Sequence, residues 1–319
     1  MKGKKPRRNT TLRIALRAVL VCAGLFLLAL FYRPRVTLSP YTVVFQEREI
    51  TGTYEGQTRF GRPDGRGRFA TEKGDVVYEG GFRLGEFYGE GRLHDEHFVQ
   101  DFPGDLVTRI GVYDGEMLDG EASGQATFRT QNKAYDWYTF TGTYAHGLWN
   151  GQGILKYDDP FYFVREGNWA DCEFVPTVEE FFRAYGTWQG MPFALTEETA
   201  AWMREHGEAM IAEPESFPAV REASWENVSD ACEPVSLTGL TIVENERNDV
   251  LWGRDFMNIC AEDAAGQRYH LLALRSFPVG WNYKIRAVVI PLALSSYPDE
   301  HAQKRPTWVC AVIDLSWEK

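Results

Sequence analysis

Histidine and cysteine are the residues of this 319-residue sequence that could do chemistry. The segment His94–His97 (HDEH) has the composition of a metal-ligand cluster, but it lacks the helical HExxH context of a zinc site. We therefore interpret it as a solvated loop. His206 falls in a predicted helix and His270 in a predicted strand, where a histidine is more often structural than catalytic.

The cysteines do not have the spacing of a metal site. Cys22 lies in an apolar N-terminal segment, and the other four are too far apart for the CxxC pairs of a zinc ribbon. Outside the cytoplasm these four could form two disulfides, in any of three pairings. Four buried thiols fit the sequence equally well. The residues concerned are Cys172, Cys232, Cys260 and Cys310.

No signature of an enzyme is present in the sequence. The chain lacks the G-x-S-x-G, Walker and kinase motifs, and we find no nucleophile paired with a base. We therefore assign no catalytic, cofactor-binding or metal-binding residue. The sequence predicts a protein without enzymatic activity and without a cofactor.

An apolar segment near the N-terminus predicts a membrane anchor. Residues 18–32 (AVLVCAGLFLLALFY) carry no charge, and extension back to Ile14 gives close to the ~20 residues that span a bilayer. Seven Lys and Arg residues precede it, so the positive-inside rule places the N-terminus in the cytoplasm and the body outside it, at the cell membrane. Alternatives are a cleaved signal peptide, a lipoprotein modified at Cys22, and a body that faces the cytoplasm.

The charge of the remaining chain is strongly acidic. Nine of the 34 Lys and Arg residues lie within residues 1–35, which contain no Asp or Glu, so residues 36–319 carry 25 basic and 45 acidic residues. Such a surface repels phosphate backbones and anionic head groups. We therefore exclude nucleic acid as a partner and do not expect the body to bind anionic lipid.

A repeat of aromatic residues and glycines extends over roughly residues 52–170. Four copies share a leading aromatic residue, glycines two, seven, eleven and thirteen positions later, and Phe or Leu at position fifteen. They begin at Tyr54, Tyr78, Tyr113 and Phe140, and the third copy has Ala126 in place of its last glycine. A degenerate fifth copy begins at Arg165. A fixed period of this kind is the sequence signature of a repeat protein.

Each copy reads as one β-hairpin. Tyr54 and Gly56 are two residues apart and therefore point to the same face of a strand, where the glycine leaves room for a neighbouring ring. The mid-repeat glycines stand where a hairpin turn needs positive φ. They are Gly61, Gly85, Gly120 and Gly147.

This repeat resembles the MORN family (membrane occupation and recognition nexus), over about 120 residues and in phase through four copies. The resemblance implies a ladder of hairpins, which we expect to have about nine strands and to expose aromatic side chains to a ligand. The largest insertion lies within Leu93–Val112, and we expect recognition there because binding residues are frequent on such loops.

After the ladder the pattern becomes helical and then β again. Thr177 and Glu180 form a capping box for a helix ending at Gly186, which we expect to pack across the end of the ladder, and a second helix follows over residues 196–211. Residues 212–234 read as a linker. Five strands are predicted at residues 236–243, 256–260, 268–274, 284–294 and 307–317.

The predicted fold is mainly β. It consists of a single N-terminal transmembrane helix with a basic tail (residues 1–35), a MORN β-hairpin ladder forming a single-layer twisted sheet (36–175), short capping helices and a linker (176–234), and a small five-stranded β-barrel similar to an OB-fold (235–319).

The predicted function is that of a signal-anchored binding or scaffold module outside the cytoplasm. A protein or a polysaccharide is the expected partner, and self-association through edge strands is a further expectation. The alternatives are a hydrolase-type enzyme with an unrecognised site in the C-terminal β-domain, and a lipid-binding module that associates with membranes.

Overall fold

The computed structural model describes residues 15–25, 32–45, 48–94, 111–131, 136–229, 232–298 and 304–318. The chain divides into two compact units. The first contains the chain up to residue 98 and the stretch Val112–Ser123, and the second contains the chain from Gly124 to the C-terminus.

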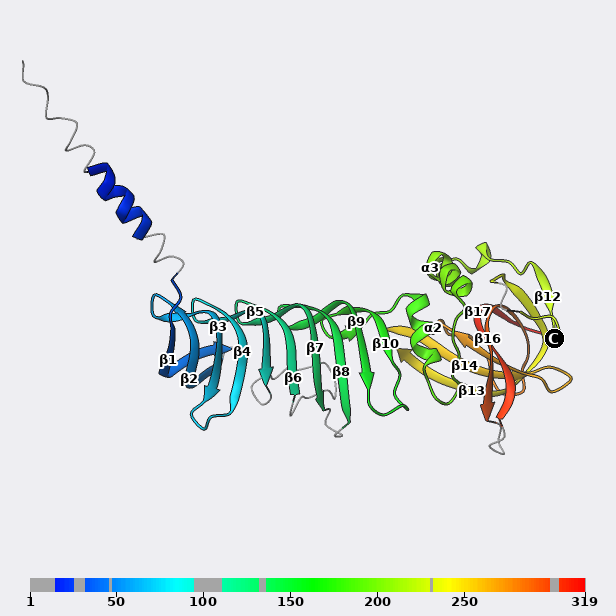
Figure 1. The fold of residues 1–319 in the computed structure, drawn as a ribbon. Coiled ribbons are helices and arrows are strands. Elements are labelled where there is room, and N and C mark those ends of the chain that lie inside the picture. Colours follow the sequence, from blue (N-terminus) through cyan, green and yellow to red (C-terminus); the bar gives the residue numbers. More distant parts are fainter. Residues whose placement is uncertain are drawn as a thin grey trace, which may run out of the picture. The chain divides into compact units, whose positions relative to one another are not determined.

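An eleven-stranded antiparallel sheet follows the order of the chain, so successive hairpins lie side by side (Figure 1). Its strands are β1 (Arg35–Phe45), β2 (Arg48–Arg59), β3 (Arg62–Thr71), β4 (Val76–Arg83), β5 (Glu86–His94), β6 (Gly111–Leu118), β7 (Glu121–Gln131), β8 (Trp137–Ala145), β9 (Leu148–Tyr157), β10 (Arg165–Ala170) and β11 (Glu173–Phe174). This arrangement is consistent with the predicted repeat ladder.

The sheet has two strands more than the nine that the repeats predict. β1 precedes the first copy and pairs with β2, and the two-residue β11 pairs with β10. β1 lacks the aromatic-glycine pattern, so the repeat alignment could not place it. Phe45 near its end packs against Phe87 of β5, with ring centroids 5.5 Å apart.

The hairpin turns have the conformation that the mid-repeat glycines predict. Gly61, Gly85, Gly120 and Gly147 have φ between 77° and 104°, and the residue before each also has positive φ, between 50° and 53°. Two consecutive residues with positive φ define the type I′ turn that matches the twist of paired strands. Those preceding residues are Phe60, Leu84, Asp119 and His146.

The repeat glycines accommodate the repeat aromatic rings. A Cβ on Gly91 would lie 2.0 Å from the hydroxyl of Tyr78, and one on Gly67 would lie 2.4 Å from the ring of Tyr54. The rings are therefore buried against a bare backbone, and Tyr54, Tyr78 and Tyr113 are fully buried. These leading aromatic rings of the repeats therefore belong to the core, because the glycines let them pack inward, whereas Phe60 in the first turn is exposed.

Both predicted helices are confirmed. α2 (Val178–Gly186) begins at Thr177, whose side chain accepts from the Glu180 backbone N–H while the Glu180 carboxylate accepts from Thr177, so both halves of the capping box are present. Asn168 of β10 donates to the Glu180 carboxylate at 3.0 Å, which holds α2 against the last strands of the sheet. α3 (Glu197–Ala212) is capped by Thr196.

The C-terminal part folds as a mixed sheet whose five predicted strands close into a ring. The strands are β13 (Val235–Leu251), β14 (Arg254–Glu262), β15 (Arg268–Ala273), β16 (Lys284–Pro298) and β17 (Lys304–Trp317). They follow the order β13-β14-β15-β17-β16, and β13 also pairs with β16. The predicted linker contains the short helix η2 (Pro214–Ser216) and an additional strand, β12 (Arg221–Ala223), which pairs in parallel with β13.

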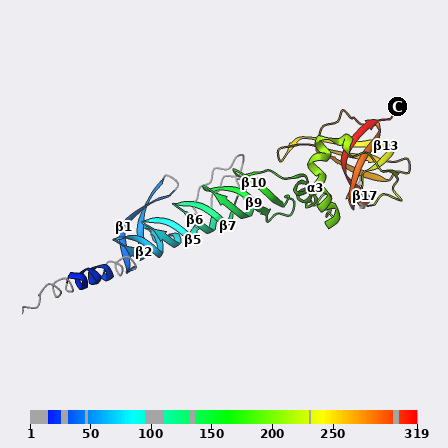
Figure 2. The same ribbon diagram turned by 90° about the horizontal axis from the view of Figure 1, so that it is seen from above.

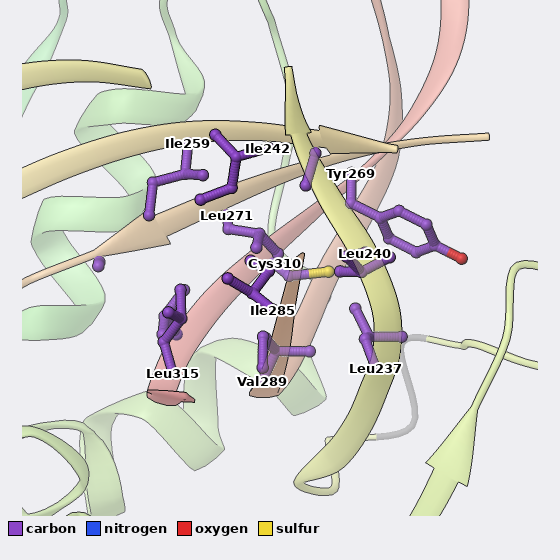
Figure 3. Close-up of a cluster of buried hydrophobic side chains, with 14 of the residues drawn as sticks. Leu237, Leu240, Ile242, Ile259, Tyr269, Leu271, Ile285, Val289, Cys310 and Leu315 are labelled. Atoms are coloured by element: carbon purple, nitrogen blue, oxygen red, sulfur yellow. The ribbon is translucent and has the colours of Figure 1, made fainter. Parts of the chain in front are cut away.

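Apolar side chains pack on the inside of this ring and on its outside. One cluster lies among the strands, and Figure 3 shows Leu271, Ile285 and Cys310 pointing into it. A second cluster joins Phe256 and Leu272 of the ring to Phe181 of α2 and to Met203 of α3. Figures 1 and 2 show the two helices beside the strands.

The N-terminal segment is described in part. Residues 15–25 are helical, and residues 1–14 and 26–31, the remainder of the predicted anchor, lie outside the described residues. Within the part of the chain that the structure describes, no helix has the length and apolarity needed to cross a membrane.

Candidate functional site

The histidines of the sequence analysis are not brought together. His94 ends β5, and the rest of the HDEH segment lies outside the described residues, as does the insertion from residue 95 to residue 110. His206 packs on α3 between Trp202 and Phe217, with ring centroids 5.1 Å and 6.0 Å away. In the described ranges, no three or more His, Cys, Asp and Glu side chains are grouped so that they could hold a metal ion.

His270 is the one of these histidines with unusual surroundings. Its side chain is buried against Tyr297, with ring centroids 4.3 Å apart. Its Nδ1 lies 3.0 Å from the Asn258 amide oxygen, and its Nε2 is buried without a hydrogen-bond partner in the structure. The amide oxygen accepts, so the ring carries its proton on Nδ1. Burial, assisted by the charge of Arg268, lowers the pKa of His270 to about 4.

Cys260 lies opposite His270 in the β14–β15 ladder, so Cys, His and Asn side chains occur together as in a thiol-dependent hydrolase. Their chemistry is unsuited to catalysis in this arrangement. Cys260 is 2% exposed, and burial raises its thiol pKa to about 12, whereas a nucleophilic cysteine needs a lowered pKa and access to substrate. All three side chains are buried, and the His270 ring packs against Tyr297 of β16.

The cysteines are thiols and none is part of a disulfide; all five lie within the described residues. Burial raises the pKa of Cys172 to about 11 and raises that of Cys310 further. The Cys172 sulfur also accepts from the Trp149 backbone N–H at 3.3 Å. The structure thus favours the thiol alternative of the sequence analysis over the two-disulfide alternative.

Thiol reactivity should follow this burial. Because the thiolate is the reactive species, Cys232, which is partly exposed, should react with a maleimide at least about tenfold faster than Cys172, Cys260 and Cys310 in the folded protein. Mass spectrometry of peptides after timed labelling measures the order. All four should react alike in denaturant, and equal rates in the folded protein would contradict the burial described above.

A candidate binding feature is a groove of about 1040 Å³ in the first unit, on the face of β1–β6 opposite the buried rings. Its floor is the backbone of glycines that stand opposite one another in consecutive strands. The pairs are Gly56 with Gly67, Gly67 with Gly80, and Gly80 with Gly91. A side chain at these glycines would point to the other face, toward the rings, so the side chains that rise from the groove floor come from the residues between them.

Charged side chains form the walls of the groove, and their sign alternates from strand to strand. Glu55 stands opposite Arg68, Arg68 opposite Glu79, Glu79 opposite Arg92, and Arg92 opposite Asp114. Neighbouring strands are about 4.8 Å apart, so the sign of the charge changes at intervals of about 4.8 Å. The sign therefore changes along the length of the ladder rather than along any one strand.

The walls carry equal numbers of both charges. The lining contains four arginines and four carboxylates, which are Arg35, Arg66, Arg68, Arg92, Glu55, Glu79, Glu90 and Asp114. Arg68 and Glu79 are 3.2 Å apart with side chains about half exposed, and such a surface pair contributes at most about 1 kcal/mol. A charged partner can replace these contacts at small cost, and the groove favours neither polyanions nor polycations.

The corresponding face of the second unit has a different chemistry. There an uncharged row crosses β7–β10, in which Gln125 donates to Thr143 at 2.8 Å and Gln152 donates to Asn168 at 2.7 Å. Asn168 also donates to the Glu180 carboxylate of α2 at 3.0 Å. The charged groove is therefore a property of the first unit and not of every repeat.

Comparison with models of known protein families gives no match for this chain, and no curated protein matches it.

The groove was missed in the sequence analysis, which followed the aromatic residues and the insertion. A signal was present: the residues flanking the repeat glycines alternate Glu55, Arg68, Glu79, Arg92 and Asp114 in successive half-repeats. The alternation across neighbouring strands can be recognised only when the strand register is known. The pairing of glycine with glycine in consecutive strands provides that register.

Proposed function

We propose that this chain is a membrane-anchored, non-catalytic binding module of the MORN-repeat type, and that the charged groove of its first unit holds a polypeptide partner outside the cytoplasm. The groove lined equally by both charges is the observation that carries this proposal. The hairpin repeats support the family, and the basic, apolar N-terminal segment supports the anchor and its orientation.

The chemistry of the groove favours a polypeptide over a polysaccharide. No aromatic residue is among the residues that line it, so a sugar ring would find no stacking platform there. A polypeptide with Lys or Arg and Asp or Glu side chains can meet both kinds of wall residue. Such pairing contributes mostly to specificity and to the rate of association.

We infer that the C-terminal ring is an OB-like barrel. The binding face of an OB-fold is formed by its second and third strands, which correspond here to β14 and β15. Phe256 and Leu272 of those strands pack against α2 and α3 in the second apolar cluster. The usual binding face is thus covered by the chain itself, and we assign partner binding to the groove.

Site-specific photo-crosslinking of the full chain in its own cells tests the proposal. We expect a crosslinker at Glu79 or Arg92 to capture a discrete polypeptide, and one at Lys73, an exposed residue in the turn after β3, to capture none. The double variant Glu79→Arg/Arg92→Glu keeps the facing pair but reverses its sign. It should reduce capture from the neighbouring position Arg68 by about tenfold, the loss of about 1.4 kcal/mol.

The exchange Arg129→Asp/Asp158→Arg is the matched control. It reverses another exposed ion pair, with Nη2 and Oδ2 2.7 Å apart, in the second unit. Capture should persist in this variant. Equal capture from Lys73, or capture from Arg68 that survives reversal of the groove pair, would rule out the groove as the binding site.

A further inference from the structure

The chain enters the ladder at the edge that carries the hairpin turns. The Pro34 carbonyl accepts from the Thr58 N–H at 2.8 Å and from the Thr58 hydroxyl at 3.3 Å. Arg33 Nε lies 2.6 Å from Oδ1 of Asp64, which is 4% exposed. Both contacts lie close to the first turn, and no slack chain separates Tyr32 from the folded ladder.

This edge exposes apolar side chains in turns that ordinarily hold Asn, Asp or Gly. Phe60 is 73% exposed at φ 52°, and Leu84 is 55% exposed at φ 53°. The third turn has the polar Asp119 in the equivalent position. The apolar turn residues are thus the two nearest to the entry of the chain, although their conformation disfavours them.

Basic residues flank the same two turns. Arg59 and Arg62 enclose the Phe60 turn, and the Arg59 guanidinium lies 5.3 Å from the centre of the Phe60 ring. Arg83 precedes Leu84 and faces Glu86 across its turn. In an acidic body this is a local concentration of positive and apolar side chains. We define the basal edge as Arg59, Phe60, Arg62, Arg83 and Leu84.

We propose that the basal edge rests on the lipid surface of the membrane that the N-terminal segment enters. This inference rests on the proposed anchor. The predicted membrane segment ends at Tyr32, one residue before Arg33, and consecutive Cα atoms are about 3.8 Å apart. The Phe60 turn therefore lies within about three residue lengths of the membrane interface, where aromatic and arginine side chains are favoured.

The tether, rather than autonomous lipid affinity, holds the edge in place. The acidic body as a whole is repelled by anionic lipid, whereas the arginines of the basal edge attract it at short range. A second copy or a soluble protein would not need the apolar turns to be next to the entry of the chain. Because the basal edge lies next to the entry of the chain, we assign the bilayer surface as its binding partner.

The test uses the full chain, with Cys22→Ser and Cys232→Ser, reconstituted into phosphatidylcholine vesicles that contain phosphatidylglycerol. An environment-sensitive fluorophore is attached at Phe60→Cys, at Leu84→Cys, or at the control Lys73→Cys beyond the other end of the strands. We expect doxyl-labelled lipid to quench the labels at 60 and 84 several-fold more than the label at 73. Aqueous iodide should show the reverse order.

Flotation of the vesicles separates the two proposals. A chain that does not float overturns the anchor, whereas a floating chain whose labels at 60 and 84 behave like that at 73 overturns the basal edge alone. Protection from iodide without quenching by lipid identifies a protein cover and also overturns it. A flexible Gly-Ser linker inserted between Tyr32 and Arg33 should abolish the lipid quenching, and quenching that survives the linker overturns the tethered geometry.

Discussion

Replacement of Gly91 by alanine is expected to lower the free energy of opening of the β4–β5 hairpin by about 3 kcal/mol, the upper end for overpacking. The new Cβ would lie 2.0 Å from the Tyr78 hydroxyl and 2.3 Å from the adjoining ring carbon. Gly91 has no positive φ, so the loss comes from the collision and not from backbone strain. The ring cannot move away easily because it stacks on Phe87 with centroids 4.1 Å apart.

Amide hydrogen exchange of peptides from β4 and β5 measures the effect locally. A loss of about 3 kcal/mol corresponds to a fall of about 100-fold in protection. The variant Gly89→Ala is a control in the same strand: its φ is 69° and no atom lies within 4 Å of its Cβ, so only a strain of about 1 kcal/mol is expected. Tyr78→Leu should recover part of the loss when combined with Gly91→Ala. Equal effects of the two alanine variants would mean that ring packing does not explain the repeat glycines.

Acidification from pH 6.5 to pH 4 is expected to destabilise the C-terminal ring by about 3 kcal/mol through His270 alone. Its pKa falls from the ordinary 6.5 to about 4 because the imidazole is buried. Below pH 6.5 the unfolded chain binds a proton that the folded chain does not, so stability is complete above pH 6.5 and is lost as the pH falls toward 4. Each pKa unit corresponds to about 1.4 kcal/mol.

Denaturant unfolding at pH 7 and at pH 4.5, followed by tryptophan fluorescence, separates this residue from the carboxylates. His270→Gln keeps a hydrogen-bonding side chain toward Asn258 but removes the titration, so it should flatten the decline between the two pH values. His206→Gln, which changes a partly exposed histidine, should leave the decline as it is. A wild-type decline equal to that of His270→Gln would show that the buried imidazole does not control acid stability.

These two predictions concern packing, whereas the groove and the basal edge concern binding, and the four can be tested independently. The groove pair Glu79 and Arg92 lies on the open face of β4 and β5. Gly91 and Tyr78 meet on the other face of the same strands. Reversal of the charge pair should therefore change partner capture with little effect on hydrogen exchange, and Gly91→Ala should have the larger effect on protection.

Those parts of the fold that depend on neighbouring residues could be predicted from the sequence. Type I′ turns need two residues with positive φ, so the mid-repeat glycines located the hairpins. Thr177 and Glu180 are three residues apart and satisfy each other's backbone groups, so the helix start was readable. The five strands of the C-terminal ring were also found, although β13, β14, β16 and β17 extend beyond the predicted limits.

Features that depend on pairing between distant segments became visible only in the folded protein. β1 carries no repeat motif and is defined by its partner β2, and the ring is closed by the pairing of β13 with β16. The burial of His270 depends on distant residues such as Tyr297, whose ring packs against the imidazole. The alternation of Glu79 and Arg92 becomes a groove wall only in the observed register. Local sequence specifies turns and caps because their energies are local; register and burial depend on residues far apart in the chain, and only the folded structure shows which of them meet.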